Sequence, residues 1–178
     1  MYWFTSDEHY FHENILKFCS RPFKNLEEMQ HELIKRHNEV VKDDDITIHA
    51  GDFLWKHNKV TADRIIQQLN GRHIFLRGSH DKWLKDDPSI NDIWQQKLDD
   101  IYVVVCHYQM FNWPRSHYGS WQLFGHSHFH NKYIGKQHNI CVDMNNFYPV
   151  SLVQIKEIMK TRNDNSNLIK KRNIGAVS

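Results

Sequence analysis

Residues 2–9 read Tyr-Trp-Phe-Thr-Ser-Asp-Glu-His, a short apolar run that ends in an aspartate and a histidine. The first four residues predict a buried strand, so Asp7 and His9 follow directly at its C-terminal end. An acidic or histidine side chain placed just after a predicted strand recurs at four further points in the chain. This recurrence predicts where strands form and where the chemically active side chains gather.

The four further groups share one position, immediately after a predicted strand. In chain order they are Asp52 after 46–49, Ser79-His80-Asp81 after 73–76, His107 after 101–106, and His126 with His128 after 120–124. The C-terminal ends of strands in a sheet-based fold converge on one rim, where ligands usually bind. Each short motif is common by itself, but five such groups in succession rarely arise by chance. We therefore expect these side chains to lie close together.

Two helices are predicted between the early strands. Asn25 and Glu28 have the spacing of a capping box, and an apolar face continues from there to about residue 42. Thr61 is the expected cap of a second helix, which ends at Asn70-Gly71. Residues 150–160 are expected to start extended or as a turn and then become a third helix.

The chain becomes rich in predicted strands from about residue 92, and the last two of these are expected at 133–134 and 139–142. The order β-α-β-α-β followed by a run of strands predicts helices packed outside a two-sheet core. The length of 178 residues suits one domain, which we place at 1–160. Residues 161–178 are polar with a basic end and predict a flexible tail. The alternative for this tail is a helix that contacts a partner or a nucleic-acid backbone.

The composition bears on the partners and the cellular location of the protein. A net charge of +2 with a pI near 8.4 does not indicate a nucleic-acid partner. No apolar run of about 18 residues is present, so no membrane span is expected, and the N-terminus does not resemble a signal peptide. The three cysteines are widely spaced and odd in number, which favours reduced thiols and a cytoplasmic location.

The mixture of carboxylates and imidazoles after the strands suits borderline divalent ions such as Mn, Fe, Zn, Co or Ni. Asp52 is the obvious carboxylate for two ions to share. Two ions held roughly 3.5–4 Å apart can clamp the attacking and leaving oxygens of an in-line displacement. The pattern therefore predicts a metal site with room for two ions.

The ordered set Asp-x-His, Gly-Asp, Gly-Ser-His-Asp, a lone His and Gly-His-x-His resembles the calcineurin-like metallophosphoesterase family. The match runs from Asp7 to His128, and the opening segment 5–15 is similar to small, capless bacterial and phage members. This resemblance implies a four-layer α/β/β/α sandwich of two mixed β-sheets flanked by helices. It also implies a short chain with no cap domain over the site.

The resemblance further implies roles for individual residues. Asp7, His9 and His128 would hold a first metal, His107 and His126 a second, and Asp52 would bridge both. His80 would be catalytic, facing the substrate and protonating the leaving oxygen. Asp81 would orient the loop.

One position departs from the family pattern, which has Asn where this chain has Ser79. A serine hydroxyl is a weaker donor than the amide carbonyl, so Ser79 would be a weak or indirect ligand of the second metal. The sequence alone does not tell whether Ser79 is natural or engineered. Asn14, His12 and Arg21 are the candidates for substrate binding, the first two at the mouth of the site and Arg21 on the phosphate.

The implied function is that of a binuclear metal-dependent phosphoesterase with two divalent ions, Mn being the first choice in vitro. It would hydrolyse a small phosphomonoester or phosphodiester by attack of a metal-bridging hydroxide. A nucleotide, a cyclic nucleotide or a nucleic-acid end are all open as substrates. The alternatives are a non-catalytic scaffold with the same fold, favoured by Ser79, and a nuclease that uses the basic tail.

Overall fold

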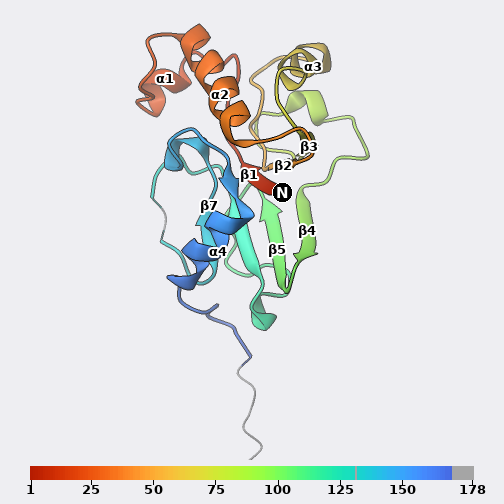
Figure 1. The fold of residues 1–178 in the computed structure, drawn as a ribbon, viewed down its shortest axis with the longest axis vertical. Helices are drawn as coiled ribbons and strands as arrows, with labels where there is room; N and C mark the ends of the chain where they lie inside the picture. Colours follow the sequence, from red (N-terminus) through yellow and green to blue (C-terminus); the bar gives the residue numbers. More distant parts are fainter. Residues whose placement is uncertain (131, 170–178) are drawn as a thin grey trace, which may run out of the picture.

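The computed structural model describes residues 1–130 and 132–169, which form two four-stranded β-sheets flanked by helices. In Figure 1, α2 (Leu26–Val40) and α3 (Lys59–Ile66) lie on one side of the first sheet and the second sheet lies on the other. Both sheets mix parallel and antiparallel pairs, and neither closes into a barrel. The predicted α/β sandwich of two mixed sheets flanked by helices is confirmed.

The first sheet has the strand order β3-β2-β1-β8. Strands β1 (Tyr2–Thr5), β2 (Ile46–His49) and β3 (Arg72–Phe75) run parallel, and β8 (Val150–Ser151) pairs antiparallel with β1. The register pairs the last residue of β1 with the last residue of β2, and that of β2 with that of β3. The three loops that follow these strands therefore start from the same rim.

The second sheet has the order β4-β5-β6-β7. Its strands are β4 (Ile93–Leu98), β5 (Ile101–Cys106), β6 (Trp121–Phe124) and β7 (Gln137–Asn139), and only β4 is antiparallel to its neighbour. The strand expected at 133–134 does not form. The strand expected at 139–142 was placed too late, because the chain turns into the 3₁₀ segment η3 (Val142–Met144) there.

The helices begin near the predicted capping residues, but the capping contacts differ from the prediction. Asn25 caps α2 through its side chain, but the Glu28 carboxylate accepts from Lys24 N rather than closing the box on Asn25. The cap of α3 is Asn58, so that helix starts before the expected Thr61. Two helices complete the set: α1 (Ile15–Phe18), which the sequence did not reveal, and α4 (Leu152–Lys160), capped by Ser151. The remaining 3₁₀ segments are η1 (Lys82–Leu84) and η2 (Ser116–Tyr118).

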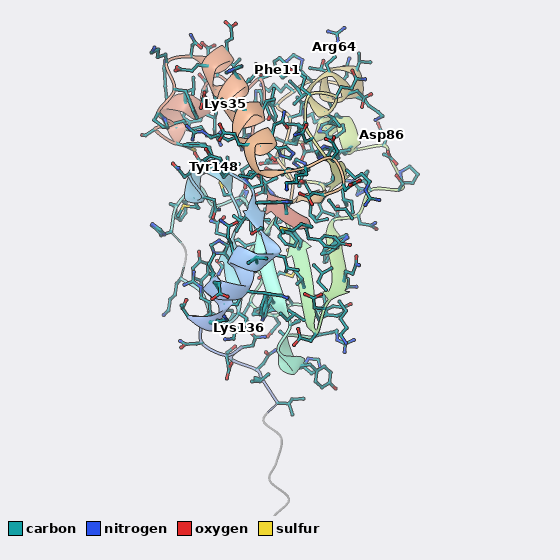
Figure 2. All side chains as sticks on the ribbon, viewed as in Figure 1. Phe11, Lys35, Arg64, Asp86, Lys136 and Tyr148 are labelled. Carbon is teal, nitrogen blue, oxygen red and sulfur yellow. The ribbon has the colours of Figure 1, made fainter. Side chains whose placement is uncertain are left out.

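Two hydrophobic clusters hold the layers together. Side chains fill the space between the layers (Figure 2). Phe4 and Ile48 of the first sheet pack with Val103 and Leu123 of the second, and all four are fully buried. A second cluster lies between the first sheet and the helices α2 and α3. Burying a side chain of this kind contributes about 1.5–3 kcal/mol. The two sheets are thus fixed face to face, with the ends of β1, β2, β3, β5 and β6 at one rim.

The first part of the expected tail, residues 161–169, does not fray. Asn165 is buried, and its amide donates to Ser116 O at 2.8 Å and Ser120 O at 2.9 Å while its Oδ1 accepts from Lys136 N at 2.8 Å. Ser116 O also accepts from Gly119 N and Ser120 O from Trp113 Nε1, so Asn165 adds a second hydrogen bond to each carbonyl and ties the segment to the turn around η2. The basic residues 170–172 lie outside the described part, and the domain limit at 160 stays a prediction. Within the described residues, no helix has the length and apolar character needed to cross a bilayer.

Three histidines lie close together on the helical side of the first sheet, where His37 and His49 are buried and His73 is half-buried. His49 Nδ1 lies 2.7 Å from Glu8 Oε1, His49 Nε2 lies 3.1 Å from His73 Nδ1, and His37 Nε2 donates to Asn70 O at 3.0 Å. Burial lowers the pKa of His37 to about 4, that of His49 to about 3 and that of His73 to about 4. Folding therefore holds these imidazoles neutral at pH values where the unfolded chain would charge them.

We predict that acid destabilises the protein through these histidines. Between the ordinary pKa of 6.5 and a folded-state pKa of about 4, the unfolded chain binds more protons than the folded one. The free energy of unfolding must then fall as the pH falls through this window, by up to about 1.4 kcal/mol per pH unit for each histidine. The free energy of unfolding can be measured by urea denaturation at a series of pH values in the presence of a chelator. It should fall less steeply with falling pH in His37→Gln than in the unchanged protein. His31→Gln, an exposed change on the same helix, is the control, and equal slopes in both variants would contradict this origin.

Candidate metal centre

Side chains from five strand ends meet at the rim. Asp52 Oδ2 is the common neighbour: it lies 3.7 Å from His9 Nε2, 3.4 Å from His107 Nε2 and 3.8 Å from His80 Nε2. The remaining side chains complete the cluster, with His128 Nε2 3.9 Å from Asp7 Oδ1 and His126 Nδ1 3.2 Å from His107 Nε2. The structure thus brings together all six residues that the resemblance names as ligands.

Two groups of donor atoms at this rim could each hold a metal ion. One consists of Asp7, His9 and Asp52, the other of Asp52, His107 and His126, and within each group the donor atoms lie within 4.8 Å of one another. The two groups share Asp52. A third overlapping group joins Asp7 and His128 to Cys141, a buried cysteine that the sequence did not single out.

The donor set fits a cation for two reasons. His9 Nε2 is buried and has no hydrogen-bond partner among the described residues, although a buried polar nitrogen is normally paired. Asp7 and Asp52 are both almost fully buried in the same cluster, where two carboxylates repel each other unless positive charge lies between them. A divalent ion between these groups would satisfy the imidazole and offset the repulsion.

The pKa shifts of the cluster go in both directions, as burial and neighbouring charges compete. Burial raises the pKa of Asp7, whereas for Asp52 burial is outweighed by the adjacent His107 imidazole and the pKa falls below its usual range. Burial would lower the pKa of His107 and His128, but neighbouring groups reverse this. Asp52 raises the pKa of His107, and hydrogen bonding, chiefly with Asp143, raises that of His128 to about 10. The carboxylates thus favour the charged form of His107 and His128, whereas burial lowers the pKa of His9 and His126.

Four of the six residues occupy a backbone conformation that the sequence did not reveal. Asp7, His9, Asp52 and His126 have φ values of 60°, 53°, 56° and 67°, in the left-handed region. Non-glycine residues held there cost on the order of 1–3 kcal/mol each and are concentrated at functional sites. Hydrogen bonds between the loops maintain the conformation: Asp7 N donates to Gly51 O and His9 N to Asp52 O, both at 3.0 Å. This backbone conformation brings the four side chains toward the other ligand residues at the rim.

Two glycines allow backbone to pass directly against the carboxylates. A Cβ at Gly78 would lie 2.3 Å from Asp52 Oδ1, and a Cβ at Gly125 would lie 2.5 Å from Asp7 Oδ2. No side chain fits at such distances. The glycines that precede Ser79 and His126 are therefore required by the position of the two carboxylates.

Two further aspartates position the ligand residues. Asp81 is buried and accepts hydrogen bonds from Asp52 N at 2.6 Å and Gly78 N at 3.0 Å, so its role is to orient the loop, as the sequence suggested. Asp143, to which the sequence gave no role, accepts from His128 Nδ1 at 2.7 Å. Carboxylates that bind the far nitrogen of a ligating histidine fix its ring and raise its basicity.

His80 and Ser79 both contact the shared carboxylate. His80 N donates to Asp52 Oδ1 at 2.8 Å, and its side chain is 38% exposed, whereas the side chains of His9 and His107 are buried. Ser79 Oγ donates to Asp52 Oδ2 at 3.0 Å. His80 therefore faces solvent at the centre, while the hydroxyl of Ser79 orients the carboxylate.

The three expected substrate-binding residues have different positions. The structure corrects the expected role of Arg21. Its buried guanidinium donates hydrogen bonds to the Asp143 carboxylate at 2.9 and 2.7 Å and to the backbone oxygens of Asp7 and Glu8. It cannot reach a substrate and instead positions the loop after β1. His12 is buried beside His9 and stacks on Trp55 at a ring distance of 3.9 Å. Asn14 is exposed at the start of α1, and no contact between its side chain and the centre is seen.

The fold and this cluster define an α/β protein of two mixed sheets with residue groups that could bind metal ions. The chain belongs to the same family as the uncharacterized protein MJ1445 of Methanocaldococcus jannaschii. The two are 33% identical over an alignment of 177 residues, which covers 89% of this chain and 94% of the relative. No protein-family model matches the chain.

Solved structures agree with the fold. The protein of unknown function AQ665 from Aquifex aeolicus is 26% identical, with a TM-score of 0.71 over 89% of this chain and 98% of that one. A mutant of Vps29 from Entamoeba histolytica aligns over 79% of this chain and 72% of its own, with 14% identity and a TM-score of 0.46. Likeness at that lower level bears on neither family nor function.

We predict that Asp52→Asn reduces metal binding more than any single histidine change at the rim. Both donor groups lose a charged oxygen in this variant, so Mn²⁺ affinity should fall by at least ~10–100-fold, the usual cost of even an outer-shell change. Calorimetric titration of chelator-treated protein with Mn²⁺ measures this directly. Asp44→Asn, in the exposed turn before β2, should bind as the unchanged protein does. Unaltered stoichiometry and affinity in Asp52→Asn would remove Asp52 from the centre.

We predict that Ser79→Asn tightens the group formed by Asp52, His107 and His126. A three-ligand site completed by water binds less tightly than one with a fourth protein ligand, and an amide oxygen at this position could supply that ligand. The weaker of two Mn²⁺ binding steps should strengthen by roughly tenfold or more. Ser79→Ala serves as the comparison, since it removes the hydrogen bond to Asp52 without adding a ligand. Two equally tight sites in the unchanged protein, with no shift in Ser79→Asn, would show that Ser79 already suffices.

Proposed function

We propose that the protein is a binuclear metal-dependent phosphoesterase of the metallophosphoesterase class. The observation that supports this most directly is the pair of three-residue donor groups that share Asp52. A carboxylate shared between two sets of carboxylate and imidazole ligands is the arrangement expected for paired divalent ions, with Mn, Fe, Zn, Co and Ni all compatible with these donors. The ordered motifs from Asp7 to His128 support the same proposal.

The residues of the centre divide into those that hold ions and those that face the substrate. Asp52 would be shared, His107 and His126 would complete one group, and Asp7 and His9, with His128 beside them, the other. Bound ions would neutralise the charge of a phosphate ester and lower the pKa of water toward neutrality.

His80 would act on the substrate itself. Its backbone is fixed by the hydrogen bond to Asp52, and Trp55 packs edge-on against its ring at 4.4 Å, while the imidazole stays open to solvent. A histidine fixed in this way can hydrogen-bond a phosphate oxygen and deliver a proton to the leaving oxygen.

The substrate would be a small or extended phosphoester, such as a nucleotide, a cyclic nucleotide or a nucleic-acid end. The segments between the motifs are short and supply no separate domain above the rim. Hydrolysis of a monoester, a diester and 2′,3′- and 3′,5′-cyclic nucleotides with Mn²⁺ would rank these possibilities.

We predict that turnover of an aryl phosphate ester requires a divalent ion and His80. Activity should disappear in chelator and return with Mn²⁺. His80→Ala should be slower by a factor on the order of 10²–10⁴ while Mn²⁺ binding stays intact, because a positioned acid is lost and no ligand is removed. His31→Ala, on the exposed face of α2, is the control.

Three outcomes would redirect the proposal. Turnover that persists in chelator excludes the metal mechanism. Tight Mn²⁺ binding without hydrolysis of any ester supports the scaffold alternative. Cleavage restricted to nucleic acid, with affinity that falls steeply with salt and on deletion of 170–178, which removes the basic end and keeps Asn165, supports the nuclease.

A further inference from the structure

A cavity of about 450 Å³ opens directly beside the candidate centre. Gly78 and His107 form the wall that it shares with the centre, and the remainder is lined by Ile93, Cys106, Tyr108 and Met110 and by the ion pair of Arg77 with Asp92. This volume lies within the roughly 300–1,000 Å³ typical of pockets for small organic ligands. Neither the metal ligands nor His80 require such a space.

The cavity leaves two apolar side chains open to solvent beside the Arg77–Asp92 ion pair. Tyr108 is 51% exposed and Ile93 is 37% exposed. The Tyr108 ring centroid lies 4.8 Å from the ring centroids of both His107 and His126. A phosphate group at the centre would therefore carry its organic substituent toward the Tyr108 ring.

The backbone below these side chains is held rigidly. Gln122 and Gln137 are completely buried, and Gln122 donates to Tyr108 O at 3.0 Å and accepts from Met110 N at 3.1 Å. Gln137 donates to Met110 O at 2.9 Å and to Gln122 Oε1 at 2.6 Å. Two buried amides thus fix a segment whose own side chains are left partly open. Preorganisation of this kind lowers the entropic cost of binding a ligand.

We propose that this cavity binds a planar aromatic group of the phosphoester, with Tyr108 as the stacking surface and Met110 as a thioether contact. Aromatic rings prefer offset or edge-to-face partners, and methionine sulfur packs favourably against ring edges. The inference rests on the proposed phosphoesterase function and assigns its substrates to esters that carry a ring, such as a nucleobase or an aryl group. Tyr108 becomes the specificity-determining residue.

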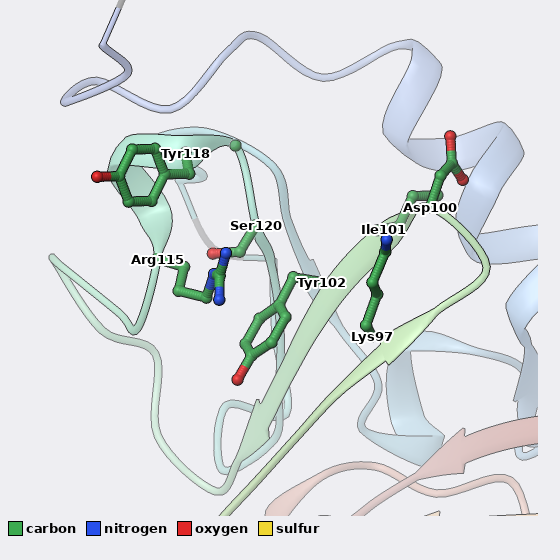
Figure 3. Close-up of a pocket in the computed structure, with 8 residues that line it drawn as sticks. Lys97, Asp100, Ile101, Tyr102, Arg115, Tyr118 and Ser120 are labelled. Carbon is green, nitrogen blue, oxygen red and sulfur yellow. The ribbon is translucent and has the colours of Figure 1, made fainter.

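A second hollow at the far end of the second sheet provides a contrast. It measures about 400 Å³ and is lined by Lys97, Tyr102, Arg115 and Tyr118 (Figure 3). There the Arg115 guanidinium already lies over the Tyr102 ring at 4.7 Å, so that aromatic face is occupied from within the protein. Tyr118 is 68% exposed and supplies a matched tyrosine that is remote from the centre.

The test compares two non-hydrolysable probes, phenylphosphonate and methylphosphonate, by calorimetry on the Mn²⁺-loaded protein. Both carry the same acid group, so their difference reports the ring alone. Phenylphosphonate should bind roughly 5- to 150-fold more tightly, the range expected for stacking on one aromatic side chain. Tyr108→Ala should remove most of this preference and leave methylphosphonate binding unchanged, Tyr108→Phe should keep it, and Tyr118→Ala should have no effect.

The outcomes separate this inference from the proposed function. Equal affinity for the two probes, no binding of phenylphosphonate, or a preference that survives Tyr108→Ala would overturn the aromatic assignment even if esters are hydrolysed. If phenylphosphonate binds more tightly through Tyr108 but the protein hydrolyses no ester, the aromatic pocket is supported and the proposed phosphoesterase function is overturned. Met110→Ala gives an independent check, since its loss should weaken phenylphosphonate alone.

Discussion

The carboxylate of Asp81 holds together the loops on which the candidate centre depends. It accepts hydrogen bonds from the backbone N–H groups of Asp52, Phe53 and Leu54 after β2 and of Gly78 after β3. Hydrogen bonds to a charged acceptor contribute about 1.5–3 kcal/mol each, and these are almost completely buried. They hold the left-handed backbone of Asp52, and through it the oxygen that both donor groups share. The parallel register of β1, β2 and β3 brings the loops to one rim, and Asp81 fixes their relative position.

Much of this arrangement follows from local sequence. Apolar runs of four to six residues identified β1, β2, β3 and β5, and the rule that parallel strand ends meet at one rim placed the six ligand-type residues together. Element boundaries were less certain for a local reason. Asn58 and Thr61 are both good helix caps and stand about one turn apart. In the structure the Asn58 side chain accepts from both the backbone N–H and the hydroxyl of Thr61, so Asn58 is the cap.

The features that escaped prediction depend on contacts between distant parts of the chain. Arg21 and Asp143 are 122 positions apart, and their pairing exists only after the second sheet has packed on the first. An arginine that pairs with a buried carboxylate is indistinguishable in sequence from one that binds a phosphate, since both use the same bidentate geometry. Likewise, Gln122 and Gln137 look like ordinary polar residues of strands until their amides are seen to hold the backbone around Tyr108.

The energetics of the rim bear on whether the centre serves only as a scaffold. Four left-handed residues, two buried carboxylates in one cluster and an unpaired buried imidazole each destabilise the fold. A protein that used this fold only as a surface would be more stable with apolar side chains at these positions, because replacing buried charges by well-packed apolar groups is often neutral or stabilising. The chain instead surrounds the cluster with Asp81 and Asp143, which maintain the strained positions and leave His80 open. Stability is thus given up at a place where a cation would restore it, which supports the proposal that this rim binds metal ions.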